Sequence, residues 1–138
     1  MKFIFAALLT LTASLLSFAS EAAEKFKLVH SKDVAGWMSD ATLKTKLAIF
    51  DANNGDTRKK YGIVPGAKLL ASSKSYDTKK VLPTDHTAKL VFYCANTHCM
   101  ASHAAAERAV KAGYTDVNVL SDGIMGWKDA GQPTENLN

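Results

Sequence analysis

Short apolar runs alternate with polar, helix-forming segments along most of the chain. The runs at residues 47–50, 90–93 and 117–120 are continuously apolar, which is typical of strands buried on both faces of a parallel sheet. Further strands are expected at residues 26–30 and 67–70. Because strands that alternate with helices favour crossover connections, the pattern predicts an α/β fold with a mostly parallel sheet and helices on both faces.

Capping residues indicate where the first two helices begin. Ser31 is the expected N-cap of a short helix at residues 32–38, which would bury Val34, Trp37 and Met38. Asp56 follows an Asn-Asn-Gly break and is expected to cap a second short helix that ends at Lys60.

The second half of the chain continues the same alternation. Residues 72–85 are polar and are expected to form a surface loop with one helical turn. A longer helix should end near Ala112, before Gly113 in a left-handed cap. A final short helix at residues 124–130 should be stopped by the glycine and proline that follow it.

The N-terminus has the pattern of an export signal. Lys2 supplies the positive start, residues 3–18 are almost wholly apolar or small, and small residues fit cleavage after Ala19 or Ala22. A membrane anchor needs roughly 20 apolar residues, and this run is shorter. We therefore expect residues 1–22 to be a signal peptide that is removed. Residues 23–138 would then form a single soluble domain, and we expect a periplasmic or secreted location.

The charge pattern excludes a nucleic-acid platform. The net charge is +4, and the lysines are scattered without aromatic residues between them. The basic residues therefore indicate a solvated surface with a mild attraction for anions. Nothing in the sequence implies a nucleotide, flavin or haem, so no cofactor is expected.

Both cysteines lie in one short loop, Cys94-x4-Cys99. The first follows the apolar run at residues 90–93 and precedes an alanine-rich helix, so it occupies a junction where N–H groups stabilise negative charge. A helix N-terminus lowers the pKa of a cysteine below about 8.5, and the thiolate is the nucleophile. A bridge across so short a loop constrains the unfolded chain little, which favours a chemical role over a structural one.

Two other interpretations of the loop stay open. His98, Met100 and His103 surround the thiols, and soft sulfur and imidazole ligands select Cu(I) or Zn, so Cys94, Cys99 and His98 are a candidate metal site. The two thiols are also a candidate thiol–disulfide redox pair. Core packing is the alternative for Met100, and an exposed position is the alternative for both histidines. Asp51, at the end of an apolar run, either orients the loop or caps the strand end.

Three stretches of the chain resemble the rhodanese-like domain family. A strand ending in Asp51 is followed by a Val-Pro-Gly-Ala turn, and the apolar run at residues 90–93 leads into Cys94. The third stretch, residues 113–133, is similar to the family's closing Gly-Ile-x-Gly-Trp-x-x-Ala-Gly-x-Pro signature, in which Trp127 is expected to be core. The resemblance implies a rhodanese-like α/β fold with a five-stranded sheet. It also implies a sulfurtransferase that carries sulfane sulfur as a cysteine persulfide.

The resemblance also assigns roles within the loop. Cys94 is the implied persulfide site, and the backbone N–H groups from Ala95 through Cys99 are the implied cradle for its charge. The expected partners are a small sulfur donor and a thiol acceptor, with Cys99 as a candidate resolving thiol. The residues expected to bind substrate are Ala95, Asn96, Thr97 and His98.

The loop departs from the family pattern in ways that bear on the substrate. Thr97 and Cys99 stand where many members have glycine and arginine, and the loop is about two residues longer. Asn53 stands where the segment after Asp51 normally has an arginine, so we expect that cation to be missing. An arginine would help to bind thiosulfate, and its absence disfavours this donor. Phosphatase chemistry, which needs a phosphate-binding arginine in the loop, is not expected.

Overall fold

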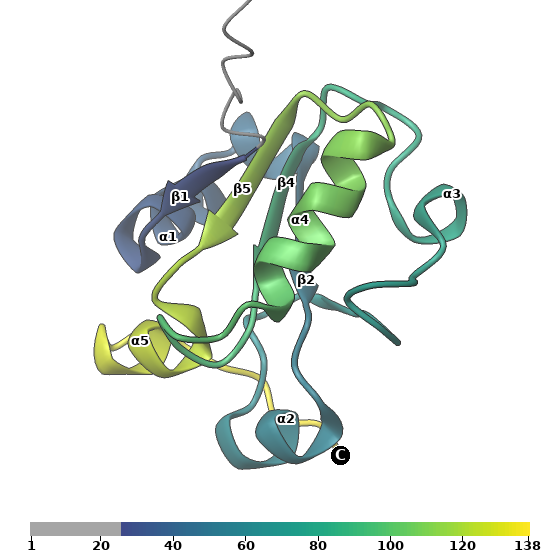
Figure 1. Ribbon diagram of the computed structural model, residues 1–138. Coiled ribbons are helices and arrows are strands. Elements are labelled where there is room, and N and C mark those ends of the chain that lie inside the picture. The colour runs from purple at the N-terminus through teal and green to yellow at the C-terminus, as the bar shows by residue number, and fades with distance from the viewer. Residues whose placement is uncertain (1–25) are drawn as a thin grey trace, which may run out of the picture.

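The computed structural model describes residues 26–138, so the expected export signal lies outside the described residues. Five parallel strands form one sheet in the order β1-β5-β4-β2-β3, which confirms the predicted fold class (Figure 1). The strands are β1 (Lys27–Val29), β2 (Leu47–Asp51), β3 (Lys68–Leu69), β4 (Lys89–Tyr93) and β5 (Asp116–Leu120).

Helices connect the strands, as the alternating pattern predicts. The single turn expected within residues 72–85 is a short helix, and Gly113 has the expected positive φ of 95° just beyond the end of the longest helix. None of the helices in residues 26–138 is long and apolar enough to cross a membrane. The helices are α1 (Ser31–Ser39), α2 (Gly55–Tyr61), α3 (Thr78–Val81), α4 (Ala101–Lys111) and α5 (Gly123–Asp129), with a 3₁₀ helix η1 (Leu43–Lys46) before β2.

Both predicted N-caps are wrong by one or two residues. His30, not Ser31, precedes α1, and its N–H donates to Asp33 Oδ2 at 2.9 Å. Asn54, not Asp56, caps α2, because its side-chain oxygen accepts the N–H of Thr57 at 2.9 Å. The carboxylate of Asp56 instead lies in the first turn of α2, where the helix dipole favours negative charge.

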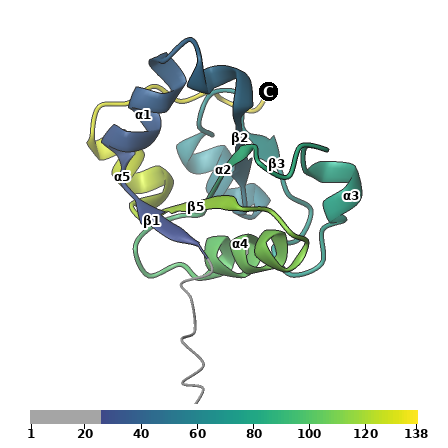
Figure 2. The same ribbon diagram turned by 90° about the horizontal axis from the view of Figure 1, so that it is seen from above.

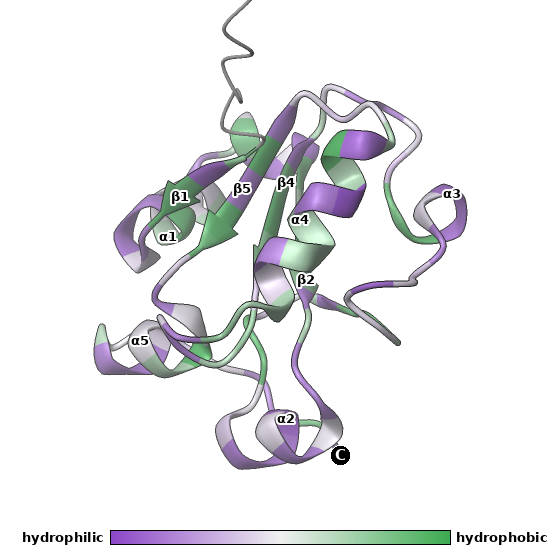
Figure 3. Ribbon diagram, viewed as in Figure 1, coloured by the Kyte–Doolittle hydropathy of each residue, from purple (hydrophilic) through white to green (hydrophobic). Residues whose placement is uncertain are grey.

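The sheet separates two apolar clusters. Helices cover both of its faces (Figure 2). The helix α4 covers one face, where Phe50 and Phe92 stack with ring centroids 5.0 Å apart. The helices α1 and α5 cover the other face, where Trp127 is 1% exposed, as expected for a core residue. Figure 3 shows hydrophobic residues along β4, between the two layers. The central strand β4 is therefore buried on both faces, and it leads directly into Cys94.

The first helix buries less than its sequence predicts. Val34 is fully buried, but Trp37 and Met38 are only half-buried at the margin of the second cluster. The ammonium of Lys89 lies 4.3 Å above the centre of the Trp37 ring. The indole is thus shielded by a charged side chain from a neighbouring strand as well as by apolar packing.

Candidate active site

The carboxyl ends of β2 and β4 meet at one edge of the sheet. Asp51 lies opposite Tyr93 in the strand register, and the N–H of Ala52 donates to Tyr93 O at 2.9 Å. Cys94 is the first residue beyond β4, and α2 and α5 lie at the same end of the sheet (Figure 1). The structure therefore places Asp51 and the cysteine loop at a common edge, where ligands of open parallel sheets bind.

Cys94 and Cys99 form a disulfide across the loop, with their Cα atoms 6.2 Å apart. Their sequence spacing did not determine whether the two sulfurs meet. Cys94 is 1% exposed, whereas Cys99 is half-buried. The loop is thus built so that one sulfur is enclosed and its partner lies nearer to solvent.

The enclosed sulfur lies against the first turn of α4. The hydroxyl of Ser102 lies 3.3 Å from Cys94 Sγ and can donate to it. The residue that precedes α4 is Met100, and no side chain in the part of the chain that the structure describes caps the free N–H groups of the first turn. A thiolate at Cys94 would therefore be stabilised by the hydroxyl and by the positive end of the helix dipole.

Asn96 shapes the loop between the two cysteines. Its side-chain oxygen accepts the N–H of His98 at 3.0 Å, and its backbone oxygen accepts the N–H of Cys99 at 3.1 Å. Two of the N–H groups expected in the cradle are therefore used within the closed loop. Those of Ala95, Asn96 and Thr97 have no protein acceptor within residues 26–138. The tendency of asparagine to bond the backbone two residues on is the local signal for this turn.

The N-terminus of α5 holds the cysteine loop from the other side. The N–H of Ile124 donates to Cys94 O at 2.9 Å, and the N–H of Met125 donates to Ala95 O at 3.0 Å. Gly123 has a φ of 66°, and a Cβ at this position would lie 2.5 Å from Ala95 O. In the sequence this glycine belongs to the closing signature, but nothing local indicates that the cysteine loop packs against it.

Asp122 attaches α5 to the start of α1. Its carboxylate accepts a hydrogen bond from the ring Nδ1–H of His30 at 2.8 Å. It also accepts hydrogen bonds from the N–H and the hydroxyl of Ser31, at 2.8 and 3.0 Å. Burial raises the pKa of this carboxyl, but the hydrogen bonds from His30 and Ser31 outweigh burial, so the pKa lies below its ordinary value. The carboxylate therefore fixes the helix end that supports Cys94.

We expect Asp122→Asn to reduce the acid sensitivity of the fold. A carboxyl whose pKa is lowered by folding stabilises the folded state above its ordinary pKa of about 4, and this contribution is lost as the pH falls toward the lower folded-state pKa. The free energy of unfolding, measured with urea from pH 6 down to about pH 3, should therefore fall more steeply in the wild type than in the variant. Asp129→Asn, which changes an exposed carboxyl, is the control. Equal slopes in the wild type and Asp122→Asn would contradict this role.

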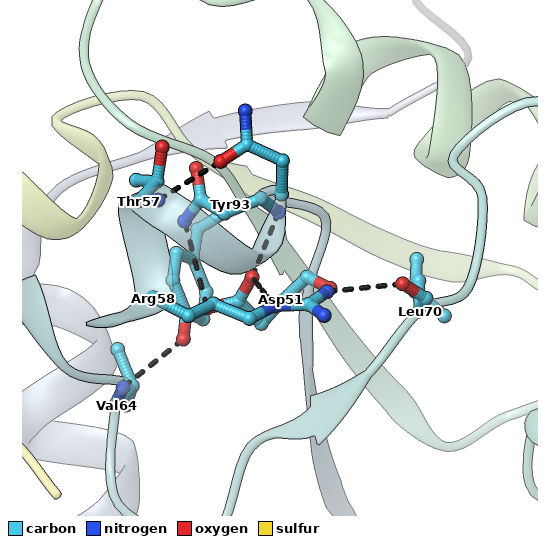
Figure 4. Close-up of polar contacts among 8 residues, drawn as sticks. Asp51, Thr57, Arg58, Val64, Leu70 and Tyr93 are labelled. Carbon is cyan, nitrogen blue, oxygen red and sulfur yellow. Dashed lines mark hydrogen bonds and ion pairs between the residues drawn. The ribbon is translucent and has the colours of Figure 1, made fainter. Parts of the chain in front are cut away.

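Asp51 forms the buried polar centre of this edge (Figure 4). Its Oδ1 accepts the N–H of Asn53 at 2.7 Å and the Nε–H of Arg58 at 3.0 Å. The Nη2 group of Arg58 also donates to the backbone oxygens of Asp51 and Leu70, each at 3.0 Å. Asp51 thus caps the strand end, and its carboxylate accepts no hydrogen bond from the cysteine loop within residues 26–138.

The family's arginine after Asp51 is absent, as expected, but a cation from another element pairs with this carboxylate. Asn53 occupies the position where the family has arginine, but Arg58 from α2 reaches back to the carboxylate. This cation is 12% exposed and its contacts are structural. Nearby, the Tyr93 hydroxyl accepts the N–H of Val64 at 3.0 Å. Burial and the Asp51 carboxylate raise the pKa of Tyr93 well above its ordinary value, so this phenol stays neutral.

The other side chains expected around the thiols are His98, Met100 and His103, and their surroundings differ. His98 is exposed, and Met100 is 63% exposed, so the core-packing interpretation of this methionine is wrong. His103 packs edge-on against Phe26, with ring centroids 5.4 Å apart, and its Nδ1 is buried without a partner. No group of three or more His, Cys, Asp or Glu side chains in residues 26–138 is placed to hold a metal ion, and both sulfurs are engaged in the disulfide.

A model of the rhodanese-like domain matches residues 32–130. The chain belongs to the rhodanese-like domain family. Membership supports, at the level of the family, a role in sulfur transfer or related chemistry. The family's closing signature includes Gly123 and Trp127, which here contact the cysteine loop and form the core beneath it. A comparison with curated protein sequences finds no match.

Solved structures share this rhodanese-like fold. A rhodanese-like domain from Anabaena superposes with a TM-score of 0.61 at 20% identity, over 80% of this chain and 79% of that one. A polysulfide-sulfur transferase homodimer from Wolinella succinogenes gives 0.64 at 17% identity, over 83% and 81%. An As-Sb reductase from Leishmania major gives 0.62 at 20% identity, over 76% and 78%.

Proposed function

We propose that this protein is a sulfurtransferase that carries sulfane sulfur as a persulfide on Cys94, with Cys99 as a resolving thiol. The observation that supports this function most directly is the position of Cys94, which lies beyond the central strand, beside Ser102 and the first turn of α4. The disulfide supports the second part, because Cys99 lies within bonding reach of the persulfide-bearing sulfur. The expected export signal puts this chemistry in the periplasm or outside the cell.

The proposed cycle begins with the reduced loop. The Cys94 thiolate attacks the outer sulfur of a donor, the donor's S–S bond breaks, and the leaving group departs with the electron pair. An acceptor thiolate then attacks the outer sulfur of the persulfide and returns Cys94 as a thiolate. Alternatively, Cys99 attacks Cys94 Sγ and expels hydrosulfide, so the two cysteines are oxidised to the disulfide while the transferred sulfur is reduced.

A polysulfide is the donor that fits this site better than thiosulfate. Thiosulfate carries a sulfonate that calls for a cation beside the attacked sulfur, and the loop between Cys94 and Cys99 contains none. Arg58 does not supply this charge, because its donors are held by Asp51 and Leu70. A polysulfide has no sulfonate group, and the N–H groups of Ala95, Asn96 and Thr97 have no protein acceptor within residues 26–138 and can donate to it.

The test is the intact mass of the protein after incubation with a polysulfide and, separately, with thiosulfate. Reduced protein should gain one sulfur atom from the polysulfide. The gain should be absent in Cys94→Ser, retained in Cys99→Ser, and longer-lived there because no resolving thiol remains. Oxidised protein should gain nothing, because Cys94 is not free to attack. Absence of any gain in the reduced protein would overturn the proposal.

A thiol–disulfide redox role is the second candidate, and the disulfide itself is the observation that favours it. In that case Cys94 and Cys99 would cycle with a thiol partner without carrying sulfur. The Cys99→Ser variant separates the two functions. Sulfur loading should survive this substitution, whereas disulfide cycling requires both thiols.

A further inference from the structure

The two sulfurs of the disulfide differ in access and in surroundings. Cys94 is 1% exposed and sits between β4, α4 and α5. Cys99 is half-buried, and it is flanked by the exposed residues His98 and Met100. A thiolate from solvent can therefore approach Cys99, while the far side of Cys94 is covered by protein.

The same asymmetry favours one leaving group. Exchange is faster when the departing thiol has a lower pKa, because it leaves as a more stable thiolate. Cys94 Sγ has the Ser102 hydroxyl at 3.3 Å and the uncapped first turn of α4 beside it. Cys99 lies on the outer part of the loop, and its N–H is bonded to Asn96 O. The stabilised thiolate is thus the one at Cys94.

From these observations we infer that Cys99 is the sulfur attacked by an incoming thiolate, and that Cys94 is released as the leaving thiolate. This inference deepens the proposed function, because it identifies how the disulfide form is returned to the form that accepts sulfur. It assigns Cys99 a second role, as the entry point for reduction.

The steps balance with two thiols as the reductant. The first thiolate attacks Cys99 Sγ, the Cys94–Cys99 bond breaks with its electron pair on Cys94, and a mixed disulfide forms on Cys99. A second thiolate attacks the sulfur of the first thiol, which releases the Cys99 thiolate and an oxidised disulfide of the two reducing thiols. The protein gains two electrons, and Cys94 is free from the first step onward.

The surface around Cys99 sets what kind of thiol can reach it. Thr97, His98 and Met100 are all exposed, so the approach is open and one apolar side chain projects beside the reactive sulfur. Residues 95–98 include no lysine, arginine or carboxylate that would select against a protein thiol by charge. Every candidate reductant attacks Cys99 as a thiolate. This thiolate can come from a small thiol or from a protein dithiol.

The experiment maps the first mixed disulfide on oxidised wild-type protein. The protein is mixed with reduced glutathione, quenched in acid at a series of early times, alkylated and digested, and the adducts are located by mass spectrometry. Extrapolated to zero time, the glutathione adduct on Cys99 should exceed that on Cys94 by at least about tenfold, because access and leaving group act in the same direction. The same mapping is then made with a Cys-x-x-Ser protein, which cannot resolve its mixed disulfide. This arm tests whether a protein thiol also attacks Cys99.

The control is the same oxidised protein in urea, where both sulfurs are equally accessible and the ratio should approach one. A Cys99 preference with glutathione alone would support the inference with a small thiol as the source, and a preference in both arms would extend it to protein dithiols. An equal distribution, or an excess on Cys94 in the folded protein, would overturn it. No sulfur donor is present, so these outcomes are independent of whether Cys94 can be loaded with sulfur.

Discussion

Gly123→Ala is expected to lower the free energy of unfolding by about 2–4 kcal/mol, since it combines left-handed backbone strain with overpacking. The backbone at this residue has a φ of 66°, which side chains other than glycine rarely adopt. A Cβ would also lie 2.5 Å from Ala95 O and 2.6 Å from Asn96 N. The substitution should therefore displace the loop that carries Cys94, and sulfur loading of the remaining folded protein should fall steeply.

Gly131→Ala provides the matched control for this prediction. Gly131 has a φ of 75°, close to that of Gly123, but a Cβ there would meet nothing within 4 Å. Its substitution should cost only the backbone strain, about 1–2 kcal/mol, and leave loading of the folded protein unchanged. Urea unfolding and the loaded fraction from intact mass report the two effects separately. If Gly123→Ala behaved like Gly131→Ala in both measurements, the close approach of α5 to the loop would contribute neither to stability nor to sulfur loading.

Arg58→Met is expected to cost about 3 kcal/mol of folding free energy, the size found when one partner of a buried ion pair is removed. Asp51 is 0% exposed, and without the guanidinium its charge would remain buried with the loss of its one cationic partner in residues 26–138, although the Asn53 amide groups would still donate to it. The backbone oxygen of Leu70 would lose a donor as well. Methionine keeps the helix propensity and most of the apolar stem of arginine. The loss of folding free energy therefore measures the contribution of the guanidinium group.

Lys59→Met is the control, because this neighbouring residue on α2 is exposed and forms no ion pair within residues 26–138. Its substitution should change the free energy of unfolding by less than about 0.5 kcal/mol. The double variant Asp51→Asn with Arg58→Met should be less destabilised than the sum of the two single variants, because both charges are removed together. Sulfur loading of folded Arg58→Met should equal that of the wild type. A selective loss of loading from an anionic donor would instead show that Arg58 binds substrate.

The continuous apolar runs determined the sheet and the place of Cys94 within it. Residues 90–93 are buried on both faces, and this pattern allows only a central strand in a sheet covered on both sides. Because the cysteine follows that strand directly and precedes a helix-forming segment, its position at the ligand-binding edge was also determined locally. The closing signature likewise indicated that Trp127 is core, which the structure confirms.

The contacts that support the site were decided only by the tertiary structure. Arg58 reaches Asp51 and Leu70, Asp122 reaches His30 and Ser31, and Gly123 lies against Ala95. Most of these residues come from different elements, and those farthest apart in sequence meet only because the strand order places β1, β5, β4 and β2 side by side.

The state of the two cysteines was decided in the same way. Their spacing is compatible with a free pair, a metal site or a disulfide, and it does not indicate which sulfur is enclosed. The packing of β4, α4 and α5 around Cys94 leaves Cys99 as the more exposed partner. A local sequence pattern thus determined which residue carries the chemistry, while the exposure and partners of that residue depend on side chains brought together by strand order and register.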